Sequence, residues 1–179
     1  MPDEAEVFGV LALMLLQDSR RAARIGDDGE IVLLEDQDRS LWNEARIAEG
    51  LRVLDRAVSL RRPGPYQLQA AIAATHAQGR PKAEIVALYD ALAAMDPSPV
   101  VQLNRAVAVA LAGDVGEGLA LLDAIDGLDQ YHLLHAARAD LYRRLDRRDD
   151  AAAAYRRALE LTTNEAESRY LRRRLAEVS

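Results

Sequence analysis

Cysteine is absent from this 179-residue sequence, and aromatic residues make up only 4% of it. Without cysteine the chain has no disulfide framework, no thiolate zinc site and no cysteine nucleophile, a composition compatible with a reducing cytoplasm. Half of the residues are nevertheless hydrophobic, so the core must be built largely from Ala and Leu. Such a core suits closely packed helices and argues against a β-sandwich or barrel.

The sequence also lacks a basic excess and any long apolar run. Its formal net charge is −6 and its pI about 5.1, so nothing draws it generally to a nucleic-acid backbone, and we expect no direct nucleic-acid contact. The longest apolar runs, residues 10–16 and 106–112, are too short to span a bilayer, and no basic region precedes an apolar run at the N-terminus. We therefore expect a cytoplasmic protein without membrane contact.

One pattern recurs three times in the chain. Units beginning at Tyr66, Pro99 and His132 are 33 residues apart, close to the period of about 34 residues in tetratricopeptide units, where a small residue lies at a helix crossing. Small or largely apolar residues recur at the eighth, twenty-fourth and twenty-seventh places: Ala73, Ala106 and Ala139; Tyr89, Leu122 and Tyr155; Leu92, Ile125 and Ala158. The pattern predicts an all-α fold, specifically a tetratricopeptide-like right-handed helical solenoid.

Six repeat helices and a terminal capping helix are expected. Their predicted bounds are 66–78, 82–95, 100–112, 115–125, 132–145 and 148–161, with the cap at 165–178. Gly and Pro between these segments interrupt helices, and the last helix hides the final apolar surface of the array. We expect one continuous domain with three parts, an N-terminal region at 1–62, the three units at 63–163 and the capping helix at 164–179.

The N-terminal region begins with a strongly apolar helix predicted at 5–17, for which Asp3 can serve as N-cap. Because nearly every face of this helix is apolar, we expect it to be covered on more than one side, by the remainder of the domain or by a preceding segment. Residues 26–29, between two short β-prone runs, predict a small hairpin or an ordered loop.

A long amphipathic helix is predicted from about 41 to 60, with Asp38 or Ser40 as its cap. The segment that precedes it, Glu35-Asp36-Gln37-Asp38-Arg39, is the densest polar cluster of the chain and lies just before the only Trp, Trp42. As an enzyme site, Asp36 and Asp38 could bind a metal or exchange protons. The structural interpretation, which we favour, is that the acidic groups cap a helix N-terminus and Arg39 pairs with one of them.

Other polar residues receive similar interpretations. His132 and His135 have a spacing that could hold a metal, but no third ligand is evident, and they are expected, like His76, to be packed or hydrogen-bonded. Asn104, beside Arg105, occupies the sixth place of its unit, which lines the inner groove of tetratricopeptide domains, where an Asn can hold a peptide backbone or carboxylate. The equivalent places are Ala71 and Ala137, which disfavours a clamp for a peptide C-terminus. No phosphate loop, nucleotide fingerprint or nucleophile elbow is present, so we expect no enzyme activity, no metal and no cofactor.

The whole chain resembles one protein group, the C-terminal extension of extracytoplasmic-function (ECF) RNA polymerase sigma factors that carries helical repeats and an Asp-Gln-Asp-Arg signature. The resemblance rests on five segments and is most specific in the one that contains the signature. These segments are Val10–Leu16, Leu33–Ser40, Gly64–Ala74, Leu103–Ala108 and Tyr131–Ala136.

The resemblance implies a regulatory module whose partners are the sigma domains of the same parent chain, RNA polymerase or both. The expected protein-binding residues are Asp36, Gln37, Asp38, Arg39, Trp42, Asn104 and Arg105. The promoter-reading domains are not in this sequence, so DNA binding does not carry over to it. Two alternatives remain open, a stand-alone tetratricopeptide adaptor that binds peptides and a metal or acid/base hydrolase that uses Glu35, Asp36 and Asp38.

Overall fold

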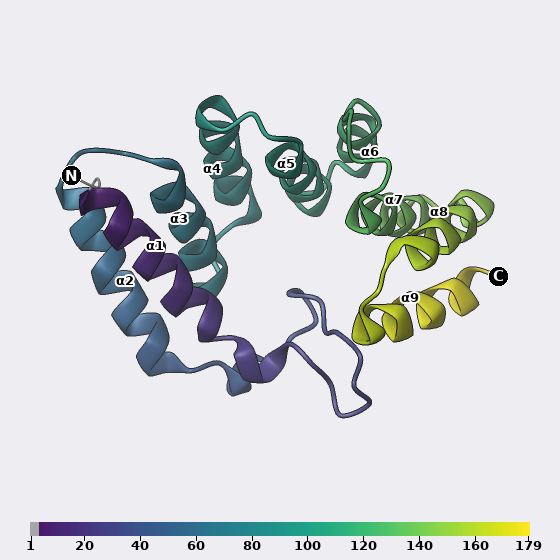
Figure 1. Ribbon diagram of the computed structural model, residues 1–179, viewed down its shortest axis with the longest axis horizontal. Coiled ribbons are helices and arrows are strands. Elements are labelled where there is room, and N and C mark those ends of the chain that lie inside the picture. The colour runs from purple at the N-terminus through teal and green to yellow at the C-terminus, as the bar shows by residue number, and fades with distance from the viewer. Residues whose placement is uncertain (1–3) are drawn as a thin grey trace. The chain divides into compact units, whose positions relative to one another are not determined.

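The structure is a computed structural model that describes residues 4–179. Within that range it contains nine α-helices, two short 3-10 turns and no strand, which confirms the predicted all-α class (Figure 1). The elements are α1 (Glu4–Asp18), η1 (Arg21–Ala23), η2 (Arg39–Leu41), α2 (Glu44–Ser59), α3 (Pro65–Ala77), α4 (Lys82–Met95), α5 (Pro99–Leu111), α6 (Val115–Asp123), α7 (His132–Arg144), α8 (Arg148–Leu161) and α9 (Glu165–Val178). Asp3, the expected cap of α1, lies outside the described residues.

The chain forms two compact units. Among the described residues, the first unit contains 4–24 together with Leu33–Pro97, and the second contains Ile25–Val32 together with Ser98–Ser179. Eight residues from the connection between α1 and α2 therefore belong to the unit that is otherwise formed by α5 to α9.

In the first unit, α1 packs against both α2 and α3, and α4 packs on α3. Its core is formed by Ala12, Leu16, Leu54, Ala70, Ala73 and Ala74. Close approach depends on missing side chains, because a Cβ at Gly9 would lie 2.9 Å from the backbone nitrogen of Gln67 and one at Gly50 would lie 2.8 Å from Cγ of Leu16. Because Gly9 and Gly50 have no side chain, α1 can approach α3 and α2 closely, and a core made of Ala and Leu fills the space between these helices.

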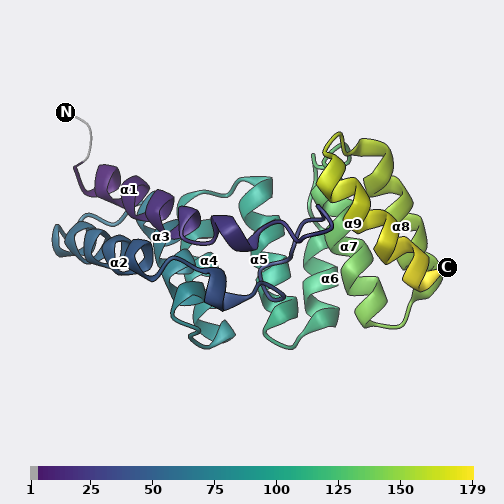
Figure 2. The same ribbon diagram turned by 90° about the horizontal axis from the view of Figure 1, so that it is seen from below.

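In the second unit, α5 packs with α6, α7 packs with α8, and α8 also contacts α9 (Figure 2). One buried cluster is formed by Leu103, Ala106, Ala110, Leu119, Leu122, Leu134 and Leu141. At the crossing of α5 and α6, a Cβ at Gly118 would lie only 2.6 Å from the Cβ of Ala110. Glycine is thus required at position 118 of this crossing.

The register inferred from the repeats corresponds to burial. All three residues at the eighth place are buried, with exposed fractions of 8%, 0% and 0% for Ala73, Ala106 and Ala139. Leu122 and Tyr155, at the twenty-fourth place, are also buried. The predicted helices 82–95, 148–161 and 165–178 coincide with α4, α8 and α9, and the other four repeat helices begin within one residue of their predicted starts.

The first helix of each predicted unit ends in the same way. After α3, α5 and α7 the chain adopts a positive φ at Gly79, Gly113 and Asp146 respectively, and the amide of the following residue donates back into the helix, as in Arg80 N–H to the carbonyl of Thr75 at 3.1 Å. This pattern is the Schellman motif, which satisfies carbonyl groups at a helix end. A shared ending at corresponding places is a second sign of repeated construction.

One prediction about the N-terminal region needs correction. The helix predicted at about 41–60 begins at Glu44, and its cap is Asn43, whose side chain accepts from Arg46 N–H at 3.0 Å, whereas Asp38 caps η2. The cause is Trp42, which is buried in an extended conformation and separates the two elements. The expected hairpin or ordered loop is an ordered loop with one isolated antiparallel bridge, between Ile25 and Ile31.

Helix α1 is covered on two sides but keeps an exposed apolar stripe. Val7, Leu11 and Met14 are 52%, 44% and 64% exposed, although the helix packs on both α2 and α3. The expected covering is therefore only partial within the described residues. No helix in the described part of the chain combines the length and apolar character that a membrane span requires.

Candidate functional site

The predicted polar cluster lies at the start of the ordered segment that leads into α2. Glu35, Asp36, Asp38 and Arg39 are exposed and Gln37 is half-buried. The turn that begins the segment is closed by a hydrogen bond from Asp36 N–H to the carbonyl of Leu33 at 2.9 Å. Oδ1 of Asp38 then accepts from Ser40 N–H at 2.8 Å, and the hydrogen bonds to Ser40 lower the pKa of Asp38. The Asp38 carboxylate is consequently ionised at neutral pH.

Arg39 connects this segment to the end of α3. Its Nη2 donates to the carbonyl oxygen of His76 at 2.8 Å and its Nη1 to that of Ala77 at 3.4 Å. These carbonyls belong to the last turn of α3, where the helix dipole is negative and a cation is favourable. The neighbouring turn at Gly79 fits closely, because a Cβ there would lie 3.3 Å from Nη1 of Arg39. Arg39 is therefore held in a fixed position.

Trp42 is the buried centre of the site. Its side chain is 6% exposed, and the guanidinium carbons of Arg39 and Arg20 lie 4.9 Å and 5.7 Å from the centre of its ring. Contacts of this kind attract a cation to an aromatic face. Next to it, Asn43 N–H donates to the carbonyl of Ser19 at 2.8 Å and links α2 to the end of α1. Among residues 4–179 the indole Nε1 of Trp42 has no hydrogen-bond partner, so packing and cation contacts hold the ring.

His76 lies beside this assembly and is uncharged at neutral pH. Burial is the main cause that lowers its pKa to about 4, and the positive charges of Arg20, Arg39 and Lys82 lower it further. An uncharged imidazole adds no repulsion to the guanidinium groups around Trp42. The expectation of a packed histidine thus agrees with its environment.

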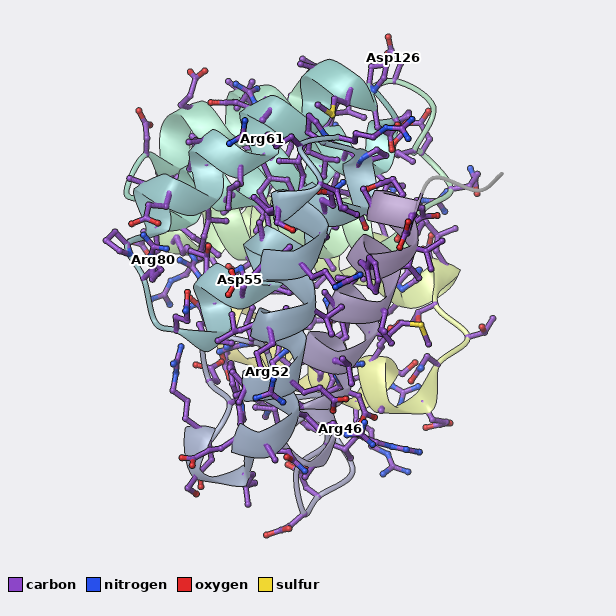
Figure 3. The ribbon with its side chains drawn as sticks, turned by 90° about the vertical axis from the view of Figure 1, so that its left-hand side faces the viewer. Arg46, Arg52, Asp55, Arg61, Arg80 and Asp126 are labelled. Atoms are coloured by element: carbon purple, nitrogen blue, oxygen red, sulfur yellow. The ribbon has the colours of Figure 1, made fainter. Side chains whose placement is uncertain are left out.

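An open pocket of about 370 Å³ lies directly beside Arg39 and Trp42. It is lined by Arg39, Trp42, Glu44, Ile47, Ala48, Leu51 and Ala77. Elsewhere α2 presents exposed charged side chains, including Arg46, Arg52 and Asp55, which are labelled in Figure 3. The pocket is therefore an apolar surface on a helix that otherwise faces water with charged groups.

The sequence did not single out this pocket, although one sign of it was present. Glu44, Ile47, Ala48 and Leu51 recur with helical spacing and share one face of α2. Ala77, however, comes from α3, and only the fold brings it to this face. Asp36–Arg39 and Trp42 were predicted as site residues, and the structure gathers Arg39 and Trp42 around the pocket.

The remaining predicted site residues lie in the second unit. Asn104 is exposed and Arg105 is half-buried, both on α5. Nε2 of His132 lies 2.8 Å from the Glu167 carboxylate on α9, and Nε2 of His135 lies 2.9 Å from the carbonyl oxygen of Asp129. These histidines thus serve contacts inside the unit.

The carboxylates of the polar cluster are arranged as surface groups. Glu35, Asp36 and Asp38 are all exposed. In the described range 4–179, no three His, Asp or Glu side chains come together as a group that could hold a metal ion. The arrangement is suited to charge-assisted hydrogen bonds with another molecule.

Comparisons with known proteins show similarities that include this segment and extend beyond it. Residues 1–58 match a family of unknown function, DUF6596. The chain is also similar to an uncharacterised protein of Rhizobium meliloti (strain 1021), with 47% identity over 180 residues, covering 97% of this chain and 43% of that protein. The chain therefore spans less than half the length of this curated relative.

Proposed function

We propose that this chain is a regulatory protein-interaction domain of an ECF-type sigma factor and that it modulates how the sigma domains engage RNA polymerase. The observation that carries the proposal is the preorganised segment before α2. Arg39 is fixed on the end of α3 and Trp42 is buried beneath it, while the Asp36 and Asp38 carboxylates remain in solvent. A rigid element with exposed charges loses little conformational entropy when it binds a partner.

Three further observations support this proposal. The segment carries the Asp-Gln-Asp-Arg sequence on which the resemblance to the sigma-factor extension depends. The similar Rhizobium protein has more than half of its length outside the shared region, which leaves room for other domains. The repeated helix endings and buried crossing residues favour a specific all-α fold, a tetratricopeptide-like right-handed solenoid. We propose that this domain meets its partners in the cytoplasm.

The test is transcription by a longer factor in which this chain follows the sigma domains. Changing Asp36→Ala and Asp38→Ala together should reduce promoter-specific transcription with RNA polymerase core, while circular dichroism of the 179-residue chain stays unchanged. A matched control changes two exposed carboxylates of the second unit, Asp126→Ala and Asp149→Ala. Equal transcription by the wild type and the first variant would remove this segment from the mechanism.

A second candidate function is that of a stand-alone adaptor that binds peptides. The apolar pocket beside Trp42 favours it, because such pockets accept side chains of extended or helical partners. If the isolated chain captures a peptide partner from a cell extract but neither sigma nor polymerase subunits, the adaptor is the better description. The hydrolase alternative receives no support from the exposed positions of Glu35, Asp36 and Asp38, since acid/base catalysis relies on environments that shift carboxyl pKa values.

A further inference from the structure

The pocket between α2 and α3 is an opening in the core of the first unit. Ile47, Leu51 and Ala77 line it and also pack, partly buried, against the core cluster of α1, α2 and α3. Helices α2 and α3 are each packed closely on α1 and touch each other much less. Apolar surface that would otherwise be covered by a neighbouring helix is consequently reachable from solvent.

The pocket lining carries two charged side chains of opposite sign, Arg39 and Glu44. Arg39 already donates to two carbonyl groups at the negative end of α3. The Glu44 carboxylate lines the pocket, is exposed, and has no hydrogen bond or ion pair within residues 4–179.

The size and lining of the pocket indicate what kind of group it accepts. Four of the seven lining residues, Ile47, Ala48, Leu51 and Ala77, are aliphatic, whereas sites for small polar metabolites bring several polar groups together. A volume of about 370 Å³ is enough for one large apolar side chain with part of its backbone. Binding by a single buried anchor within a polar rim is common at protein interfaces.

We propose that this pocket binds a short peptide segment of a partner protein through one large apolar side chain, Leu, Met, Phe or Trp, next to a Lys or Arg that pairs with Glu44. The apolar anchor displaces water from Ile47, Leu51 and Ala77. The basic neighbour meets the free carboxylate of Glu44 at the margin. This inference rests on the proposed function, because it names the chemistry of the partner that meets the segment from Asp36 to Trp42.

The test selects peptides with the intact 179-residue chain. A phage-displayed library of random twelve-residue peptides is panned on the chain, and a fluorescent peptide of the enriched sequence is titrated by polarisation. We expect enrichment of a large apolar residue adjacent to Lys or Arg. Ala48→Phe should fill the pocket and weaken binding by about tenfold or more, since an apolar anchor then loses its buried contacts.

Ala45→Phe is the matched control, because Ala45 is also exposed on α2 but does not line the pocket. It should change affinity by less than about twofold. Glu44→Gln should weaken binding several-fold and reduce its dependence on salt, because the ion pair is lost. This second variant keeps the test valid if Ala48→Phe alters the fold, which circular dichroism would reveal.

Several outcomes would overturn the inference. These are the absence of any enriched sequence, enrichment of acidic or uncharged flanks, or equal binding to the wild type and the Ala48→Phe variant. Displacement of the peptide by a second copy of the chain would assign the pocket to self-association and also refute the inference. If peptides bind as expected but Asp36→Ala with Asp38→Ala leaves transcription by the longer factor unchanged, the proposed role of this segment in transcription fails and the peptide site stands.

Discussion

Residues 25–32 and 33–43 follow one another in the connection between α1 and α2, yet they belong to different compact units. The first segment is attached to α9 by charged groups, with Nε of Arg173 at 2.7 Å from the Glu30 carboxylate and Nη1 of Arg169 donating to the carbonyl of Asp28 at 3.3 Å. The second is attached by burial of Trp42 and by the fixed guanidinium of Arg39.

The connection between α1 and α2 therefore combines two kinds of attachment, charged contacts at the surface for residues 25–32 and a buried side chain for residues 33–43. Ion pairs near the surface typically contribute about 0–1 kcal/mol and are screened by salt. A buried Trp contributes about 3–5 kcal/mol, judged from truncation to Ala. We therefore expect residues 25–32 to open locally at a much lower free energy than residues 33–43.

The largest effect is expected from matched apolar truncations in the two segments. Trp42→Ala should lower the free energy of unfolding by about 3–5 kcal/mol, because the ring is 6% exposed. Ile25→Ala should lower it by only about 0.5 kcal/mol or less, because Ile25 is 51% exposed. Urea denaturation measures both values, and equal losses would mean that burial does not distinguish the segments.

A smaller effect is expected when Arg39 is replaced by Gln. The variant loses the charged hydrogen bond to His76 and the contact with the Trp42 ring, which together correspond to about 1–3 kcal/mol. Arg39→Lys keeps the charge but not the two-pronged donor geometry, so it should restore only part of the loss. Thermal unfolding of both variants checks this, and a melting temperature of Arg39→Gln equal to that of the wild type would contradict it.

The effect of His76 should depend on pH. Its pKa in the folded chain is about 4, whereas an unfolded histidine has a pKa near 6.5. Between these values the unfolded state binds more protons, so the free energy of unfolding falls as the pH falls from about 6.5 towards 4.

His76→Gln removes this contribution, and its melting temperature should therefore fall less than that of the wild type between pH 7 and pH 5.5. An NMR titration should give a pKa near 4 for His76 and a higher value in the Arg39→Gln variant, since one nearby positive charge is gone. A normal histidine pKa in the wild type would show that the ring is solvated.

The smallest effect is expected at the charged attachment. Arg173→Gln should cost about 1 kcal/mol or less, but it should speed hydrogen exchange of the Gly26 amide, which donates to the carbonyl of Glu30 at 2.9 Å. Added salt should have a similar effect on the wild type and little on the variant. The Trp42 indole environment, followed by fluorescence, serves as the internal control and should stay constant.

Most helices could be predicted because local residues mark their ends. Pro65 and Pro99 occupy the first turns of α3 and α5, and Gly79 and Gly113 follow the same helices with positive φ. These residues act through the backbone, so their effect does not depend on the tertiary fold. The apolar period of the same helices supplied the register that burial later matched.

The start of α2 and the pocket could not be predicted for the opposite reason. Asp38, Ser40 and Asn43 are all suitable caps within six residues, and only the burial of Trp42 selects Asn43. Likewise, Arg39 meets carbonyl groups 37 and 38 residues further along the chain. Such distant pairings leave no periodic trace in a single sequence.

The membership of residues 25–32 in the second unit also orders events during synthesis. Ile25–Val32 is translated before its docking partners Arg169 and Arg173, which lie on α9. Domains generally fold as units while the chain is being made, N-terminal ones first. These eight residues can therefore dock only after α9 has been translated.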